Sequence, residues 1–293
     1  MPPSLPDYEL VRCIGRGGYG EVWLARSVTG NYRAVKVIYR GSFQEARPFD
    51  REFLGIQRFE PISRMHPGLV AILHVGKNDV AGHFHYVMEV ADDVASGQRI
   101  DAGTYVPKTL SQLLEDKRRF PIGEAAELGL ALTAALGFLH GRGLVHRDIK
   151  PSNIIFVNGV PKFADIGLVA VMDEHSSYVG TAGYIPPEGP GSATADLFSL
   201  GKVLYQIVMG LGEADFPELP ARVDETTHLP ELLRFNQLIL KACEPDYRQR
   251  FQTAEQMHEA LHCIAVGLPA SARSFSSATT QKGTPPAEPR AQL

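Results

Sequence analysis

The sequence predicts an α+β fold of two lobes, an N-terminal lobe of antiparallel sheet with one main helix and a larger, helical C-terminal lobe. Up to about residue 90, short runs that alternate apolar and polar residues are separated by glycines, which is typical of strands. From about residue 109, apolar residues recur at helical spacing. With 293 residues, 44% of them hydrophobic, the chain can bury a substantial core.

The first lobe is predicted element by element. Residues 8–40 contain "YELVRCIGRGGYGEVWLARSV" and "NYRAVKVIY", which we interpret as a twisted antiparallel sheet. Residues 47–59, "RPFDREFLGIQRF", are predicted to be a helix whose four apolar side chains share one face: Phe49, Phe53, Ile56 and Phe59. The segments 69–76 and 83–91 are predicted to be two further strands.

The second lobe begins with a strongly apolar helix at residues 124–143, which is expected to stop at Gly141 or Gly143. Further helices are expected at residues 193–210, 229–243 and 253–266. Residues 268–293 are rich in Ser, Ala, Pro and Thr and have almost no large apolar side chains, so a disordered tail is expected there.

Composition narrows the class of function. A net charge of −4 argues against a nucleic-acid binder. Cys13, Cys243 and Cys263 are far apart and odd in number, which fits a reducing compartment and predicts a cytoplasmic protein. The N-terminus lacks the pattern of a signal peptide, and no stretch is expected to be long enough to cross a membrane. The pattern carries no signal of oligomeric state.

Glycines in "GRGGYGEV" supply the first chemical signal. Gly15, Gly17 and Gly20 stand in G-x-G-x-x-G spacing, which lets backbone N–H groups approach phosphate oxygens. A dinucleotide-binding motif needs a helix after its glycines. Here "EVWLARS" follows, which is a second strand, so the sequence predicts a hairpin that covers phosphates.

A lysine follows within an apolar strand, Lys36 in "AVKVI". On its own it would be interpreted as an edge lysine that extends to water. Beside a phosphate-binding hairpin it can neutralise substrate charge, and a glutamate of the next helix could orient it. Glu52 is preferred for that role over Glu45 and Glu60, because a helix with Glu52 facing inward also carries Phe53 and Ile56 into the core.

The stretch "HRDIKPSN", residues 146–153, places many polar side chains between two apolar segments. Asp148 can accept a proton from an attacking hydroxyl, and Lys150 can neutralise a phosphate in transfer. Asn153 and, in "FADIGLV", Asp165 offer two oxygen donors of the kind that Mg²⁺ binds. The loop is therefore interpreted as a catalytic one and not as a solvated turn.

Taken in this order, these motifs resemble the eukaryotic-like protein serine/threonine kinases of the bacterial type, over roughly residues 8–265. The resemblance implies the two-lobed protein-kinase fold over residues 8–267, with lobes at about 8–90 and 91–267. It implies ATP and Mg²⁺ as cofactors, with Mn²⁺ as an alternative ion. Lys36, paired to Glu52, would bind the α- and β-phosphates, Asp148 would be the catalytic base, and Asn153 and Asp165 would hold the metal ion.

The resemblance also implies an adenine pocket and two supporting contacts. Met88 would be the gatekeeper, and the backbone from Glu89 to Ala91 would hydrogen-bond adenine. The nucleotide would be enclosed by the glycine-rich loop and apolar side chains: Ile14, Gly15, Gly17, Gly20, Val22, Ala34 and Ile155. Glu188 would pair with Arg250, and Asp196 would anchor the catalytic loop.

Lys150 and Thr181 together are typical of kinases that phosphorylate serine and threonine, so protein substrates with Ser/Thr acceptors are expected. The alternatives are a pseudokinase that acts as a nucleotide-binding scaffold and a small-molecule phosphotransferase. A pseudokinase would be expected to lack one of the charged site residues, and none is lost. A small-molecule phosphotransferase usually lacks the segment from Thr181 to Glu188.

The sequence departs from the family pattern at three places. Ile166 replaces the aromatic residue of D-F-G, which is expected to alter packing and not activity. The segment 92–108 is longer than usual, and is interpreted as an extended linker in preference to a binding loop. Within 211–228 the usual docking helix is expected to be short or missing.

The sequence also suggests a switch. Arg147 precedes Asp148, and in the family such an arginine receives a phosphorylated residue of the activation loop. The candidate acceptors are Ser176 and Ser177, with Tyr178 as a weaker third. In the competing interpretation, Asp173 or Glu174 already supplies the negative charge.

Overall fold

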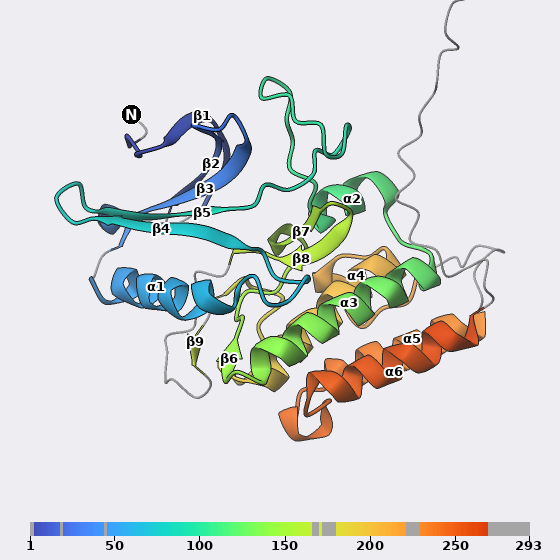
Figure 1. Ribbon diagram of the computed structural model, residues 1–293. Helices are drawn as coiled ribbons and strands as arrows, with labels where there is room; N and C mark the ends of the chain where they lie inside the picture. Colours follow the sequence, from blue (N-terminus) through green and yellow to red (C-terminus); the bar gives the residue numbers. More distant parts are fainter. Residues whose placement is uncertain are drawn as a thin grey trace, which may run out of the picture.

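A computed structural model describes residues 3–17, 20–43, 46–165, 170–171, 180–220 and 229–268 of the chain. It confirms the predicted α+β fold of two lobes (Figure 1). Several of the residues discussed above lie outside the described ranges: Glu45, Ile166, Asp173, Glu174, Ser176, Ser177 and Tyr178, and all but the first residue of the tail.

The N-terminal lobe is a five-stranded antiparallel sheet with the order β1-β2-β3-β5-β4. Its strands are β1 (Tyr8–Arg16), β2 (Gly20–Ser27), β3 (Tyr32–Tyr39), β4 (Ile72–Asn78) and β5 (His83–Met88). Successive side chains of β5 alternate between the two faces of the sheet. Phe84, Tyr86 and Met88 join the main core on one face, and Val87 packs with Val35 in a smaller cluster on the other. The strands of both predicted segments thus form one sheet.

Helix α1 (Ala46–Phe59) runs beneath this sheet (Figure 1). Phe49, Ile56 and Phe59 are buried, and Phe49 and Phe53 pack on Phe84 with ring centroids 5.1 and 5.2 Å away. The predicted apolar face is therefore the face that contacts the sheet. The same rotation of the helix turns Glu52 inward, where its side chain is also buried.

The C-terminal lobe is built on helices that bury the core, drawn from green to orange-red in Figure 1. They are α2 (Leu110–Lys117), α3 (Ile122–His140), α4 (Ala193–Met209), α5 (Leu229–Ala242) and α6 (Ala254–Gly267). Helix α3 ends at His140, directly before Gly141, and Gly143 follows with a φ of 71° that an L residue rarely adopts. Both glycines therefore lie where the sequence predicts the end of the helix.

Four short strands lie between these helices: β6 (Leu144–Val145), β7 (Ile154–Val157), β8 (Val160–Phe163) and β9 (Ala170–Val171). They pair as two small antiparallel ribbons, β6 with β9 and β7 with β8. In the described part of the segment 211–228, which ends at residue 220, the regular structure is the 3-10 turn η5 (Glu213–Asp215).

Helix α3 corrects one expectation from the sequence. At 19 residues it is long and apolar enough to cross a membrane, by length and composition alone. In the structure most of its side chains are buried, and it packs against α6 and α4 as the central helix of the lobe.

A partly buried ion pair joins the chain just before α4 to the chain just before α6. Glu188 accepts hydrogen bonds of 2.5 and 2.9 Å from the two Nη atoms of Arg250. The Arg250 side chain is fully buried, and its Nε also donates to the carbonyl of Glu244 at 2.6 Å. This guanidinium therefore holds two chain segments that are 62 residues apart.

Arg250→Met is expected to lower the free energy of unfolding by about 3 kcal/mol, because it leaves a partly buried carboxylate and several carbonyls unpaired. Arg248→Met is the matched control, since the Arg248 side chain is 76% exposed, and it should change stability by less than about 1 kcal/mol. Urea denaturation of both variants measures the difference. Equal losses would contradict the assigned role of Arg250.

Candidate active site

A buried carboxylate holds the loop that carries "HRDIKPSN". Asp196, near the start of α4, accepts hydrogen bonds from the backbone N–H groups of His146 and Arg147 at 2.8 and 2.9 Å. It also contacts His140 Nε2 at 2.9 Å. Although burial opposes ionisation, these hydrogen bonds lower the pKa of Asp196. The loop is thus anchored on the core helix, as the family resemblance implies.

Arg147 adopts a φ of 73° directly before Asp148, and this conformation is uncommon for an L residue. The two N–H groups bound by Asp196 belong to Arg147 itself and to the preceding residue, His146. The anchored carboxylate therefore stabilises a backbone turn that would otherwise be strained.

Four of the predicted site residues meet around the Asp148 carboxylate. Thr181 Oγ1 donates to Asp148 Oδ1 at 2.8 Å and accepts from Lys150 Nζ at 2.7 Å. Lys150 Nζ also lies 2.8 Å from Asp148 Oδ2. Asn153 Nδ2 donates to the same Oδ2 at 2.8 Å and to the Asp148 carbonyl at 2.9 Å. The Asp148 side chain is therefore fixed in one orientation by three neighbours.

Asp165 adopts a backbone conformation with a φ of 53°, and the N–H of the preceding residue, Ala164, donates to the Asn153 carbonyl at 2.8 Å. Asp165 Oδ1 accepts a short hydrogen bond from Lys36 Nζ, while the side chain as a whole remains 41% exposed. Desolvation opposes ionisation there, but Lys36 lowers the pKa of Asp165 below its ordinary value. The carboxylate is therefore charged at neutral pH.

The oxygen donors of Asn153 and Asp165 fit a hard divalent cation. The amide nitrogen of Asn153 is committed to Asp148, which leaves its amide oxygen for a ligand. Asp165 adds an ionised and partly exposed carboxylate. Mg²⁺ needs only one or two such protein ligands, because phosphate and water fill the other positions.

Glu52 differs from the prediction. Its side chain is 5% exposed, but it lies outside ion-pair distance of Lys36, and its Oε2 has no hydrogen-bond partner. Burial raises the pKa of Glu52 to about 7, with Lys36 acting in the opposite direction. The predicted contact between Lys36 and Glu52 is not formed, and the Lys36 ammonium group pairs with Asp165 instead.

The residues predicted to enclose the nucleotide lie on the sheet and on strand β7 of the second lobe. Sheet register brings Ala34 opposite Met88, Val22 opposite Lys36, and Gly15 opposite Val22. Ile14 on β1 and Ile155 on β7 belong to the two lobes respectively. A Cβ at Gly20 would collide with the Val37 carbonyl, so only glycine fits there, whereas Gly17 faces open space.

The connection between the lobes is held more firmly than the sequence suggests. The Glu89 N–H donates to the Ala71 carbonyl at 3.1 Å, so Glu89 offers an adenine its carbonyl and not its N–H. Its carboxylate accepts from Lys162 Nζ on β8 at 2.6 Å. The Ala91 carbonyl accepts a hydrogen bond from Tyr105 Oη at 3.1 Å. Sequence reasoning missed both Lys162 and Tyr105.

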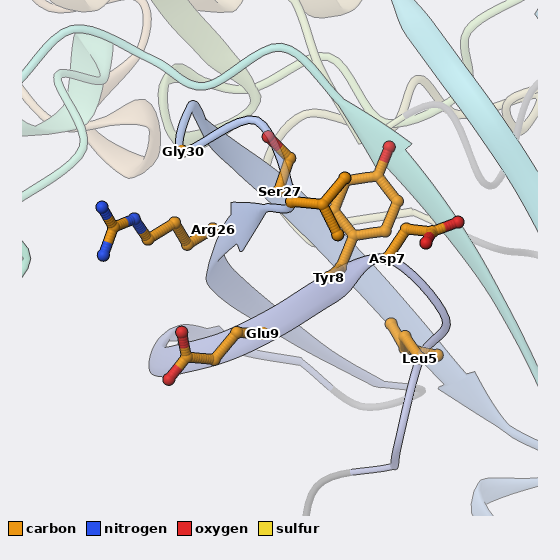
Figure 2. A pocket seen from close by; sticks show the side chains of 8 residues that line it. Leu5, Asp7, Tyr8, Glu9, Arg26, Ser27 and Gly30 are labelled. Atoms are coloured by element: carbon orange, nitrogen blue, oxygen red, sulfur yellow. The ribbon is translucent and has the colours of Figure 1, made fainter.

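Two pockets flank this arrangement. One, of about 460 Å³, adjoins Lys150 and Thr181 and is also lined by Ser111, Glu115, Tyr184 and Glu213. The other, of about 480 Å³, lies at the outer edge of the sheet, on β1 and β2. Figure 2 shows that the charged side chains of Asp7, Glu9 and Arg26 around it point in different directions. The first pocket is therefore the one that adjoins the Asp148 cluster, through Lys150 and Thr181.

Comparison with known proteins identifies the class. The protein kinase domain family matches residues 8–265, and the chain belongs to this family. This confirms the resemblance inferred from the motifs.

Among curated proteins, the chain is 31% identical to a probable serine/threonine-protein kinase, CPE1738, of Clostridium perfringens, over 85% of this chain and 37% of that protein. It is 29% identical to the serine/threonine-protein kinase PknG of Mycolicibacterium smegmatis, over 87% and 32% of the two chains. It is 28% identical to PknB of Mycobacterium leprae, over 92% and 45%. The chain therefore spans less than half the length of these relatives.

Proposed function

We propose that this protein transfers the γ-phosphoryl group of ATP to serine or threonine hydroxyls of proteins. The observation that carries the proposal is the closed set of contacts among Asp148, Lys150 and Thr181. These contacts support Asp148 as the general base, Lys150 as the cation and Thr181 as the orienting hydroxyl, and a pocket adjoins Lys150 and Thr181.

The chemical step assigns one role to each residue. The acceptor oxygen forms a bond to the γ-phosphorus, the bond from phosphorus to the β–γ bridging oxygen breaks, and ADP leaves with that electron pair. The hydroxyl proton passes to Asp148. Lys150 lies 2.8 Å from Asp148 and carries the positive charge that the transferring group meets.

A divalent cation, Mg²⁺ or Mn²⁺, would be held by the amide oxygen of Asn153 and the carboxylate of Asp165. Such an ion neutralises phosphate charge. Lys36, on β3 and in contact with Asp165, is assigned to the α- and β-phosphates. The family resemblance associates this pair of Lys150 and Thr181 with serine and threonine acceptors, and the contacts of the Thr181 hydroxyl with Lys150 and Asp148 support that class.

The direct test incubates the purified protein with labelled ATP and Mg²⁺, with and without a generic basic protein as acceptor. Transfer of label supports the proposal. Nucleotide binding without any transfer would favour the alternative, a pseudokinase that acts as a scaffold.

The compartment belongs to the proposal as well. Cys13, Cys243 and Cys263 are all free thiols, which fits a reducing cytoplasm. Fractionation of cells that produce the protein tests this, and recovery in an oxidising compartment would refute it.

Asp148→Asn and Asp165→Asn are expected to abolish transfer in different ways. Asp148→Asn removes the base, so the rate should fall by at least about 10²-fold while ATP affinity survives. Asp165→Asn removes a metal ligand and should weaken Mg-ATP binding as well. Turnover and equilibrium nucleotide binding, measured on both variants, separate the two effects. Persistent transfer in either variant would break the assignment.

Thr181→Val keeps the shape of the side chain but loses both hydrogen bonds that orient Asp148 and Lys150. We expect kcat to fall by about 10²-fold, because small displacements of catalytic groups cost that much. Thr181→Ser retains the hydroxyl and should recover most of the rate. Steady-state kinetics with a protein acceptor measures all three enzymes. If Val and Ser variants behave alike, the hydroxyl has no orienting role.

Autophosphorylation is the regulatory prediction. Arg147 is buried beside Asp148 with its backbone fixed on Asp196, and a phosphate is a stronger arginine partner than a carboxylate. Treatment with ATP is expected to modify Ser176 or Ser177 and to raise activity. Mass spectrometry of the peptide, with activity before and after phosphatase, checks this. Full activity with an unmodified peptide would favour Asp173 or Glu174 as the built-in anion.

A further inference from the structure

The segment 92–108 between the lobes, interpreted from the sequence as an extended linker, is a folded loop in the structure. In Figure 1 it rises in green beside the β1–β2 ribbon. Asp93 organises it: Oδ1 accepts from the N–H groups of Ala95 and Ser96 at 2.9 and 2.8 Å, and Oδ2 accepts from the Val106 N–H at 2.8 Å. Burial opposes ionisation of Asp93, but these hydrogen bonds lower its pKa.

The base of this loop is fixed to the second lobe. Both carboxylate oxygens of Asp92 accept backbone N–H groups from the turn between β7 and β8, Asn158 at 2.9 Å and Gly159 at 2.8 Å. The Asp92 N–H donates to the Phe156 carbonyl at 2.7 Å, and the Phe156 N–H donates to the Lys108 carbonyl at 3.0 Å. Both ends of the loop are therefore bound to the ribbon that carries Ile155.

The far part of the loop contacts the first lobe. Arg12 on β1 donates to the carbonyl of Gly103 at 3.4 Å, and through Nη2 to the carbonyl of Tyr105 in a short hydrogen bond. The Tyr105 side chain is 2% exposed, and its hydroxyl donates to the Ala91 carbonyl. Tyr105 thus accepts a hydrogen bond from Arg12 of β1 through its carbonyl, and its hydroxyl donates one to the connection between the lobes.

We propose that residues 92–108 form a strap across the mouth of the nucleotide pocket, with Arg12 and Tyr105 as positioning residues for nucleotide binding. The strap links three parts of the pocket: β1, which carries Ile14 and Gly15; the connection at Ala91; and β7, which carries Ile155. The proposal rests on the proposed function, because the ligand that the strap positions is ATP.

The physical effect of the strap is to order the glycine-rich end of β1 relative to the connection at Ala91. Fixing the backbone of the glycine-rich end of β1 relative to Ala91 costs conformational entropy. A hydrogen-bonded strap meets part of that cost before the nucleotide binds, which raises affinity through preorganisation. Neither Arg12 nor Tyr105 contacts Asp148, so the expected effect is on nucleotide affinity more than on the transfer step.

Tyr105→Phe is the minimal test, because it removes only the hydroxyl bound to Ala91. The dissociation constant for ATP, measured by displacement of a fluorescent ATP analogue, is expected to rise about five-fold. Arg12→Met removes charge-assisted hydrogen bonds and should raise it about ten-fold, with an intermediate value for Arg12→Lys. In turnover assays the rise in KM for ATP should exceed any fall in kcat.

Matched controls come from the same two residue types. Tyr32→Phe changes a partly buried tyrosine on β3, and Arg99→Met changes an exposed arginine within the strap itself. Both should leave the ATP dissociation constant unchanged. A second variant joins Val94 to Val106 through two glycines in place of residues 95–105, because the Val94 N–H and the Val106 carbonyl are already 2.9 Å apart.

In the shortened protein, Arg12→Met should have no further effect on ATP affinity, because its partners are gone. If wild type binds ATP and Tyr105→Phe, Arg12→Met and the shortened protein bind it equally well, the strap proposal is overturned and the proposed function stands. If wild type does not bind ATP at all, both fail. Circular dichroism confirms folding, and Tyr105→Phe decides the matter should the shortened protein not fold.

Discussion

The Asp196 carboxylate is the contact on which the rest of the site depends. It is 1% exposed on helix α4, and it holds the backbone of His146 and Arg147 from the inside of the protein. A buried charge is tolerated only when its hydrogen bonds are satisfied, and here the loop itself supplies them. The strained backbone at Arg147 and the direction of Asp148 follow from this one interaction.

A second set of contacts joins the two lobes and fixes the distance between them. At the back of the cleft, Lys36 of β3 contacts Asp165, and along the connection Glu89 contacts Lys162 of β8. At the front, Arg12 of β1 contacts the strap. Each contact joins the first lobe, or the connection that follows it, to a segment further along the chain. The residues proposed to bind the nucleotide are therefore held by cross-lobe contacts, whereas the Asp148 cluster is held within the second lobe.

This division explains what the sequence could predict. Helices α1 and α3 to α6, and the five strands of the sheet, have long periodic patterns, and the sequence predicted them. Helix α2 has eight residues and β6 only two, which is too short for a period to be recognised. The catalytic loop could be identified because its polar residues are adjacent in sequence. Tyr105 could not, because its contact with Arg12 joins residues 93 apart through a carbonyl, which any residue possesses.

Glu52 shows the same limit of prediction from sequence, because its ionisation depends on a partner that the sequence does not reveal. Sequence reasoning placed it on the inner face of α1, where it lies, and assigned it Lys36 as a partner. Which carboxylate an ammonium group meets depends on the spacing of the two lobes, and no local pattern encodes that spacing. In this arrangement Asp165 has the partner and stays ionised, while Glu52 is buried without one and its pKa rises to about 7. A buried carboxylate without a partner is costly. Glu52 carries this desolvation cost, whereas Lys36 offsets it at Asp165. The partner that Lys36 meets therefore depends on how the two lobes are held together, and the strap and the contact between Glu89 and Lys162 are two of the connections that hold them.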